Sequence, residues 1–350
     1  YPFQLVMSPL VSAIAAGNCV MVKPSELSPA TSKIITKIIL DTFNEEHIAC
    51  IEGDAEVSQQ LLKLPFDHIF FTGSTQIGKI VMAAAAKNLT SVTLELGGKS
   101  PTIIDKEVNL DKAAQKIAWG KLVNAGQTCI APDYVLVHQD RLDEFIGLYK
   151  QHATQMYFKA KEQINTEVYG KIISKKHFER LSALITEAVD QGARINWGGK
   201  TDEKTLTIYP AVLSQIPNGA KLMYEEIFGP ILPVIAYETL DEAIAFVNKK
   251  PKPLALYIFS DNNKNTNKLI KQTSAGGTCI NDVLVHIANP KLPFGGVNHS
   301  GMGSSHGFFG FSNFSHQRTV VKQRNIDFNH LVYPPYQAKQ WVLKMLKRIM

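Results

Sequence analysis

Short apolar runs alternate with longer amphipathic stretches along the first hundred residues. Continuous apolar runs of strand length occupy residues 18–23, 47–52, 67–73 and 91–96. The stretches between them have the spacing or composition of helices, at residues 28–43, 55–64 and 75–88. Strands that are apolar throughout and alternate with helices predict a parallel sheet covered on both faces.

The stretch 28–43 carries the clearest helix signals. Ser28 is suited to cap the helix, and Pro29 is suited to its first position. One apolar stripe is formed by Ile34, Ile35, Ile38, Ile39 and Phe43. The stripe indicates an amphipathic helix.

The sequence FFTGSTQIGKIV places a turn between a predicted strand and a predicted helix. Gly73 and Ser74 lie where the strand ends and the helix opens, so backbone N–H groups and the helix dipole favour an anion there. The spacing to Gly78 and Lys79 is that of a P-loop, but Ile80 stands where a magnesium-binding hydroxyl is required. Taken alone, the turn is either a phosphate site or an ordinary tight connection.

Composition narrows the class of protein. The chain has 350 residues, of which 45% are apolar and 19% charged, and its net charge is +6. This favours a large core, two domains rather than one, and no extended disorder. Because no basic stripe carries interleaved aromatics, nucleic acid is not an expected partner. No apolar run is long enough to span a bilayer, and the first residues lack the pattern of a signal peptide.

The four cysteines are widely spaced, at positions 19, 50, 129 and 279. None forms a C-x-x-C pair, so neither a disulfide framework nor a zinc site is expected, and a reducing cytoplasmic environment fits best. Cys19 and Cys50 lie in apolar strands and are interpreted as small core residues. Cys129, in NAGQTCIAP, and Cys279, in GGTCIN, both lie among small residues that can present a thiol to a cleft. The local sequence favours Cys129 only slightly.

Glu95 is a further candidate for chemistry. It ends an apolar strand and precedes two glycines in LELGGK. Burial would raise the pKa of this carboxyl toward neutrality, which suits a general base. The alternative is a glutamate at the end of a strand that turns to water.

Two later loops are ambiguous by themselves. Residues 223–234 combine two acids, Phe228 and a Gly–Pro turn, and fit a solvated loop equally well. The glycine-rich residues 293–307 either line an entrance or merely connect elements. His299 and His306 have no neighbouring acid at metal-ligand spacing, so no metal site is predicted.

Five ordered motifs together resemble the aldehyde dehydrogenase superfamily: KPSE, FTGS, LELGGK, GQTC and EEIFGP. The segments KPLALYIFS, PFGG, SGMG and FSHQR make the chain similar to its class 3 branch of fatty and aromatic aldehyde dehydrogenases. The resemblance implies an α/β fold with a Rossmann-type parallel-sheet cofactor domain, an α/β catalytic domain and a carboxyl-terminal oligomerisation arm. The expected cofactor domain, which is amino-terminally incomplete, covers residues 1–96, and the catalytic domain covers residues 97–307. The expected arm covers residues 308–329, and a basic amphipathic tail covers residues 330–350.

The resemblance also implies roles for individual residues. Cys129 becomes the nucleophile and Glu95 the general base, while Cys279 becomes a bystander thiol. The resemblance implies three parts of a cofactor site. The pyrophosphate is bound by Gly73, Ser74 and Gly78. The adenosine ribose is bound by Lys23 and Glu26, and the nicotinamide end by Glu226 and Phe228. The charge of Glu26 favours NAD over NADP, although NADP is possible.

The implied reaction oxidises an aldehyde, medium- or long-chain aliphatic or aromatic, to its carboxylic acid. Cys129 attacks the carbonyl, hydride leaves for the nicotinamide, and Glu95 activates the water that hydrolyses the thioester. The Cys129 backbone N–H is one donor to the oxyanion. The asparagine that supplies the second donor in this family would directly precede Tyr1, so we expect the chain to be a poorly active fragment.

Other functions stay open at this point. Ile80 argues against a nucleotide hydrolase, and Glu95 argues against a CoA-acylating aldehyde dehydrogenase, which needs no base for water. A non-catalytic relative of the enzyme is favoured by the missing amino-terminal part and opposed by the presence of Cys129, Glu95 and Glu226. The resemblance implies a homodimer joined through residues near 308–326. The basic tail is expected to pack on protein more readily than on a membrane surface.

Overall fold

The computed structural model describes residues 1–160, 163–323, 333–335 and 337–348. The chain divides into two compact units, residues 1–315 and residues 316–350. All predicted site residues belong to the first unit, and the second contains the short helix α11 (Gln340–Leu346). The predicted arm and tail fall partly outside the described residues. Within the described part of the chain, no helix combines the length and the apolar character needed to cross a bilayer.

Seven strands form the main sheet, in the order β15-β14-β5-β6-β13-β12-β9. In chain order they are β5 (Pro101–Ile104), β6 (Tyr134–His138), β9 (Arg194–Gly198), β12 (Ala211–Ser214), β13 (Ile231–Tyr237), β14 (Ala255–Phe259) and β15 (Gly277–Ile280). Neighbours from β15 to β12 run parallel, and only the edge strand β9 is antiparallel to its neighbour.

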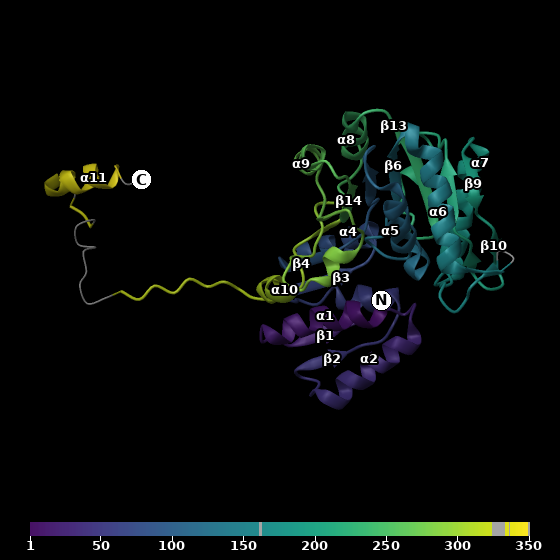
Figure 1. Ribbon diagram of the computed structural model, residues 1–350. Coiled ribbons are helices and arrows are strands. Elements are labelled where there is room, and N and C mark those ends of the chain that lie inside the picture. The colour runs from purple at the N-terminus through teal and green to yellow at the C-terminus, as the bar shows by residue number, and fades with distance from the viewer. Residues whose placement is uncertain (161–162, 324–332, 336, 349–350) are drawn as a thin grey trace. The chain divides into compact units, whose positions relative to one another are not determined.

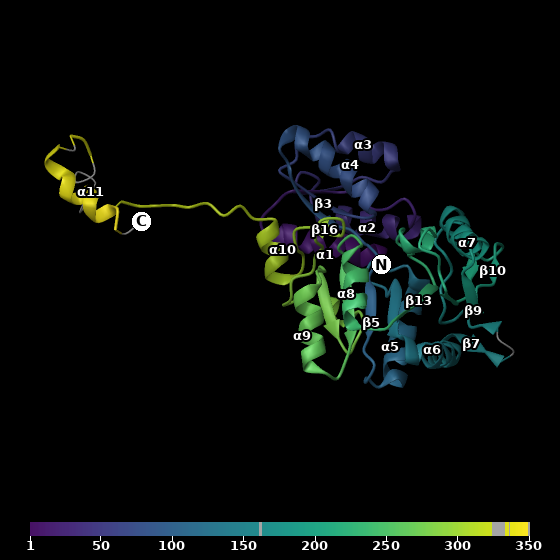
Figure 2. The same cartoon turned by 90° about the horizontal axis from the view of Figure 1, so that it is seen from above.

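Helices cover both faces of the main sheet (Figure 2). Ile104 and Val137 belong to a core that includes α5 (Leu110–Leu122), α6 (Leu142–Tyr157) and α7 (Lys175–Asp190). Ile103 and Leu136, one residue earlier in each strand, join the core with α8 (Leu240–Asn248) and α9 (Asn263–Gln272). Because successive side chains of a strand point to opposite faces, these strands are apolar throughout.

The amino-terminal elements form two smaller sheets (Figure 1). β1 (Val20–Val22) pairs in parallel with β2 (Ile48–Cys50), and β3 (His68–Thr72) pairs in parallel with β4 (Ser91–Glu95). The helices here are α1 (Pro2–Ala15), α2 (Pro29–Thr42), α3 (Ala55–Leu61) and α4 (Thr75–Ala85). The predicted strands and helices form at the predicted places. The strands do not join one sheet, however, because β2 and β3 do not pair.

Some details of the sequence interpretation are wrong. The stripe on α2 is narrower than predicted: Ile35 and Ile39 are buried, but Ile34 is 53% exposed. Ser28 does not cap α2 with its side chain, because its hydroxyl donates to the carbonyl of Ser25 (3.3 Å).

Two further predictions about burial also fail. Cys19 is exposed and not a core residue, since it precedes β1. All residues of β3 are only half-buried, so helices do not fully cover both faces of this strand.

Helix α1 has no counterpart in the sequence prediction, which assigned nothing to residues 2–15.

The glycine-rich loop 293–307 returns to the amino-terminal elements. Within it, β16 (Gly301–Met302) pairs antiparallel with β4, with Gly301 opposite Glu95. Helix α10 (Gly307–Asn313) follows and packs on α1 (Figure 1). The loop therefore extends the small sheet that ends in Glu95. Two further antiparallel pairs complete the described strands, β7 (Phe158–Lys159) with β8 (Gln163–Ile164) and β10 (Thr201–Asp202) with β11 (Thr207–Ile208).

Candidate active site

Cys129 lies in a loop between α5 and β6 that is held in an unusual backbone conformation. Asn124, Ala125 and Gly126 all have positive φ angles, of 53°, 52° and 74°. A side chain at Gly126 would collide with the backbone carbonyl of Gly229, so only glycine fits there. These turns end α5 and set the direction of the chain toward the cysteine.

The neighbouring Gln127 fastens this loop. Its amide nitrogen donates to the carbonyls of Asn124 (3.0 Å) and Lys171 (3.1 Å), and its amide oxygen accepts from the N–H of Ile173 (2.9 Å). The Tyr1 hydroxyl lies 3.2 Å from the Thr128 hydroxyl on the other side. The cysteine is thus presented from a loop that its own motif, GQTC, helps to fix.

The thiol of Cys129 is strongly disfavoured as an anion in this structure. Burial, followed by the charges of Glu226 and Glu95, raises its pKa to about 12, against the smaller opposing effect of the N–H groups of Cys129 and Ile130. Both carboxylates therefore lie near the sulfur. Burial and the neighbouring acids together outweigh these backbone donors.

Glu95 is buried at the end of β4, only 6% exposed. Burial raises its pKa to about 8, and a hydrogen bond from Ser305 lowers the pKa by less. The Ser305 hydroxyl donates to Oε1 (2.9 Å), whereas Oε2 is buried without a hydrogen-bond partner among the described residues. The strand-end carboxyl therefore faces the interior and not water.

Glu226 lies against the glycines of LELGGK. A side chain added at Gly97 would overlap the Glu226 carboxylate, and the Gly98 backbone N–H donates to that carboxylate. Burial, followed by the charge of Asp133, raises the pKa of Glu226 to about 7. Phe228, two residues on, is 37% exposed and has a φ angle of 49°.

A buried ion pair holds the loop that carries Glu226. Lys99 pairs with Asp133 and also donates to the carbonyls of Leu222 (2.8 Å) and Glu225 (2.9 Å). Asp133 in turn accepts from the backbone N–H of Ile227 (2.8 Å). Since all three contacts reach the backbone of residues 222–227, the pair fixes the segment on both sides of Glu226.

Arg180 of α7 supports the same loop from the other side. Its guanidinium donates to the carbonyls of Glu226 (3.2 Å) and Ile227 (2.6 Å). The sequence analysis missed Lys99, Asp133 and Arg180. Lys99 could have been found, since it is the last residue of LELGGK and a charge beside an apolar strand requires a partner.

The turn after β3 holds the residues that the sequence predicted for pyrophosphate, and the N–H groups of Gly73 and Gly78 donate to the carbonyls of Glu95 (3.0 Å) and Ser74 (2.9 Å). The hydroxyl of Ser74 caps α4 by accepting from the N–H of Ile77 (3.4 Å). Gly78 is buried against Leu96, and a side chain there would approach Leu96 to 2.7 Å. In this structure Gly78 lets α4 pack closely on the chain after β4, and its predicted part in binding phosphate stays a prediction.

Lys23 and Glu26 lie together after β1. Their ion pair measures 2.8 Å, and the lysine hydrogen bond lowers the pKa of Glu26. Both remain accessible, with side chains 17% and 46% exposed. The residues predicted for the two ends of a dinucleotide thus offer a cation, ribose-binding carboxylates and a helix start, so they fit NAD or NADP chemically.

The two predicted catalytic residues and the predicted nicotinamide-binding Glu226 lie at one edge of the main sheet. Cys129 precedes β6, Glu226 precedes β13, and Glu95 ends β4 a few residues before β5 begins. The amino ends of three parallel strands therefore face the carboxyl end of β4. Cys279 does not join them directly: its sulfur lies 3.1 Å from Nδ1 of His286, and the thiol is buried.

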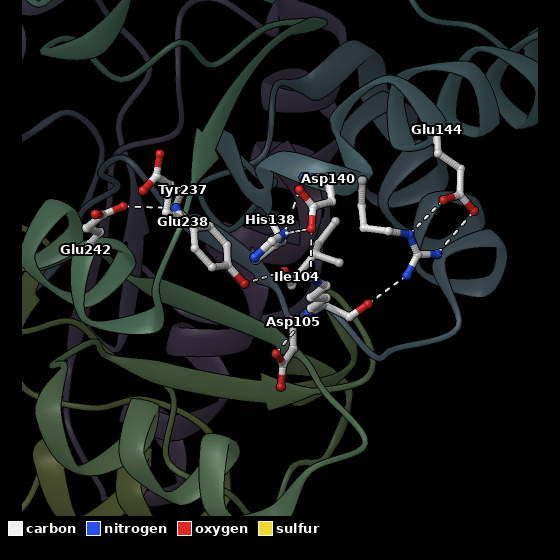
Figure 3. A network of polar contacts seen from close by, with 10 residues as sticks. Ile104, Asp105, His138, Asp140, Glu144, Tyr237, Glu238 and Glu242 are labelled. Atoms are coloured by element: carbon white, nitrogen blue, oxygen red, sulfur yellow. Dashed lines mark hydrogen bonds and ion pairs between the residues drawn. The ribbon is translucent and has the colours of Figure 1, made fainter.

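The opposite edge of the sheet is bridged by the chain's own polar groups (Figure 3). The Tyr237 hydroxyl at the end of β13 donates to the Ile104 carbonyl at the end of β5 (2.8 Å). His138, at the end of β6, has its Nδ1 3.5 Å from Oδ2 of Asp140. Parallel sheets often bind ligands at their carboxyl edge, and here the Tyr237 hydroxyl and the His138 ring at that edge contact groups of the protein itself.

Comparison with known proteins identifies the family. The sequence pattern described as the aldehyde dehydrogenase family matches residues 1–320. The chain belongs to the aldehyde dehydrogenase family. The prediction of family and of the α/β fold is confirmed, while the oligomerisation arm stays a prediction, and the protein is an NAD(P)-dependent oxidoreductase of aldehydes.

Individual relatives agree with the class 3 resemblance. The chain is 47% identical to mouse aldehyde dehydrogenase family 3 member A2, with 99% of this chain and 72% of the relative covered. It is 46% identical to the 4,4'-diaponeurosporen-aldehyde dehydrogenase of Staphylococcus aureus, with coverage of 97% and 73%. The structure titled as the substrate-bound state of Staphylococcus aureus AldH superposes with a TM-score of 0.93 at 46% identity, covering 99% of this chain and 74% of that one.

Proposed function

We propose that this protein oxidises aldehydes to carboxylic acids through a covalent intermediate on Cys129, with Glu95 as the general base. The observation that carries the proposal is the electrostatic coupling of Cys129 to both Glu226 and Glu95, whose charges add to burial in raising the thiol pKa to about 12. A nucleophile, a base and a second acid therefore share one site that is assembled from three separate segments, in which Glu95 is buried and Cys129 and Glu226 are half-buried.

The cofactor proposal follows from the chemistry of the accessible groups. We propose that Ser74, Gly73 and Gly78 form the pyrophosphate site, and that Lys23 and Glu26 bind the adenosine ribose. Glu226 and Phe228 are assigned to the nicotinamide end. When bound, the oxidised nicotinamide supplies the hydride acceptor that aldehyde oxidation requires.

The residues proposed to bind the adenosine ribose favour neither NAD nor NADP strongly. A free carboxylate at Glu26 would repel a 2′-phosphate, but Lys23 lies 2.8 Å from it and offsets its charge. We therefore propose that the protein uses NAD and also accepts NADP.

The protein's own groups account for nucleophilic attack and release. The Cys129 thiol loses its proton to solvent as the sulfur attacks the carbonyl carbon, and the Cys129 backbone N–H stabilises the oxyanion. After oxidation to the thioester, Glu95 takes a proton from water as the water attacks, and the acid leaves. A pKa of about 8 makes Glu95 a stronger base than an ordinary carboxylate once it is ionised.

Substrate class and assembly complete the proposal. Cys129 packs against the main apolar core, which supports medium- or long-chain aliphatic or aromatic aldehydes. Phe308 and Phe311 of α10 are 73% and 42% exposed, which supports the predicted homodimer contact. We propose the cytoplasm as the location, and a division into a cofactor-binding part to residue 96 and a catalytic part over 97–307.

Replacing each cysteine in turn tests the proposal. We expect Cys129→Ala to abolish acid formation from a panel of aldehydes with NAD or NADP, without CoA, because the nucleophile is lost. Cys279→Ala is the matched control and should keep activity within about twofold, since its sulfur hydrogen-bonds His286 and is not among the groups coupled to Glu95. Labelling with iodoacetamide should modify Cys129 and be slowed by NAD. Acid formation that survives in Cys129→Ala would overturn the assignment.

A further inference from the structure

Ser305 is the one described side chain that hydrogen-bonds the proposed base. Its hydroxyl lies 2.9 Å from Oε1 of Glu95 and 3.2 Å from the carbonyl oxygen of Phe294. A hydroxyl has a single proton to donate, so the two acceptors share or alternate for it. The two oxygens of Glu95 are consequently not equivalent, because Oε2 is buried and has no partner.

The backbone around Ser305 is fixed. Its N–H donates to the Phe294 carbonyl (2.6 Å), and the Phe294 N–H donates to the Ser305 carbonyl (3.2 Å). The same loop pairs with the strand of Glu95 through β16, and Ser300 accepts from the N–H of Leu96 (3.1 Å). The hydroxyl is therefore held beside Glu95 by backbone contacts on both sides.

We propose that Ser305 is a positioning residue for Glu95: it holds Oε1 and leaves Oε2 as the oxygen that receives the proton from water. This inference rests on the proposed role of Glu95 as the base. Phe294 offers the hydroxyl a second acceptor, so Ser305 keeps a hydrogen bond when Glu95 is protonated on Oε1 or turns away.

The groups around Glu95 determine how much the Ser305 hydrogen bond affects the pKa of this carboxyl. The ionisable groups on the elements around Glu95 are Cys129, Glu226, His306 beside Ser305, His68 on β3 and Lys79 on α4. Burial lowers the pKa of both histidines, and among the described residues no cation forms an ion pair with Glu95. The Ser305 hydroxyl is thus the group that favours the ionised carboxylate against burial.

An infrared titration of the purified protein tests the inference without turnover. The C=O band of a protonated buried carboxyl, assigned by its absence in Glu95→Gln, should disappear as the pH rises through about 8. In Ser305→Ala the band should persist to higher pH, because the donor to the carboxylate is gone. Ser305→Thr, which keeps a hydroxyl, and Ser304→Ala, at the neighbouring serine, should titrate as the wild type does. An unchanged titration in Ser305→Ala would overturn the proposal.

Hydrolysis of a nitrophenyl ester separates this inference from the proposed function. Acylation of Cys129 gives a burst of nitrophenol, and the slower steady rate reports water attack. At pH 7 Ser305→Ala should keep the burst and lose on the order of tenfold in the steady rate, which recovers at high pH.

The outcomes of the two measurements can be told apart. A shifted titration with a steady rate that Glu95→Gln does not lower would remove Glu95 as the base while keeping the contact. Should Ser305→Ala fail to fold, Ser305→Cys, a weaker donor, should move the titration in the same direction by less, and no movement would overturn the proposal.

Discussion

Glu95 and Glu144 carry the same carboxyl group in opposite surroundings. Burial raises the pKa of Glu95 to about 8, whereas the guanidinium of Arg141 lowers the pKa of the exposed Glu144. The pKa of a side chain in this protein thus depends on its solvation more than on its residue type. Cysteines show the same effect: Cys19 is exposed, Cys279 is buried against His286, and Cys129 lies beside two acids.

The raised pKa of Glu95 predicts how stability depends on pH. A carboxyl whose folded pKa lies above its unfolded value near 4.5 stabilises the fold at low pH, and this contribution is lost as the pH rises toward about 8. Glu95→Gln removes the buried charge, so at pH 9 it should raise the free energy of unfolding by on the order of 2–4 kcal/mol.

Urea denaturation at pH 5 and pH 9 measures this difference. At pH 5 Glu95→Gln should differ little from the wild type, because the native carboxyl is already neutral. Glu45→Gln, on the exposed surface, is the control and should change neither value. A Glu95→Gln protein that is less stable than the wild type at pH 9 would contradict the burial of an ionisable Glu95.

At the scale of elements, the loops between strands carry the site, and buried polar contacts fix the loops. The Cys129 loop depends on Gly126 and Gln127, and the Glu226 loop depends on Lys99, Asp133 and Arg180. Helices and strands supply the frame, since Ser74 caps α4 and Asn109 caps α5 (3.0 Å to the Lys112 N–H). These caps are local to each helix, although the one cap predicted from the sequence, Ser28, makes no such bond, whereas contacts between loops leave no local signal.

The Lys99–Asp133 pair predicts a large loss when one partner is removed. Lys99→Met leaves Asp133 as an unpaired buried charge and frees two loop carbonyls, so we expect a loss of about 3–5 kcal/mol in the free energy of unfolding. The exposed pair Lys106–Asp140, with side chains 48% and 53% exposed, is the control, and Lys106→Met should cost no more than about 1 kcal/mol.

Urea denaturation of the two variants checks this prediction. The double variant Lys99→Met with Asp133→Leu should recover part of the loss, because no charge is left unpaired. Equal effects at positions 99 and 106 would show that the buried pair does not hold the loop.

At the scale of the whole molecule, the carboxyl-terminal part of the first unit closes on its amino-terminal part. β16 adds to β4, and α10 packs on α1 (Figure 1). Asn18 joins the two ends directly, since its amide donates to the carbonyls of Ala13 (3.1 Å) and Phe314 (2.9 Å). Segments 296 positions apart are thereby held together.

This closure predicts a stability effect far from the site. Asn18→Ala removes both hydrogen bonds and should lower the free energy of unfolding by about 1–2 kcal/mol. Asn88→Ala, whose amide makes one long contact of 3.4 Å with the Leu64 carbonyl, should cost less. Thermal unfolding of the two variants compares them, and a cost at Asn88 equal to that at Asn18 would contradict a specific role for the closure.

The sequence by itself determined the amino-terminal elements apart from α1, the family and the residue types of the site. Apolar periodicity and composition placed α2, α3, α4 and the strands β1 to β4, because burial of one face or both leaves a local pattern. The motifs around Cys129, Glu95 and Glu226 indicated the chemistry because each motif is contiguous in sequence.

Only the tertiary structure decided how the segments meet and what that does to their charges. The amino-terminal strands divide into two sheets, which no local pattern predicts. Lys99 and Asp133 hold residues 222–227, and Ser305 contacts Glu95, so both contacts join segments that are distant in sequence. The pKa values of Cys129 and Glu95 follow from these contacts, because desolvation and neighbouring charge depend on distance in space and not on position along the chain.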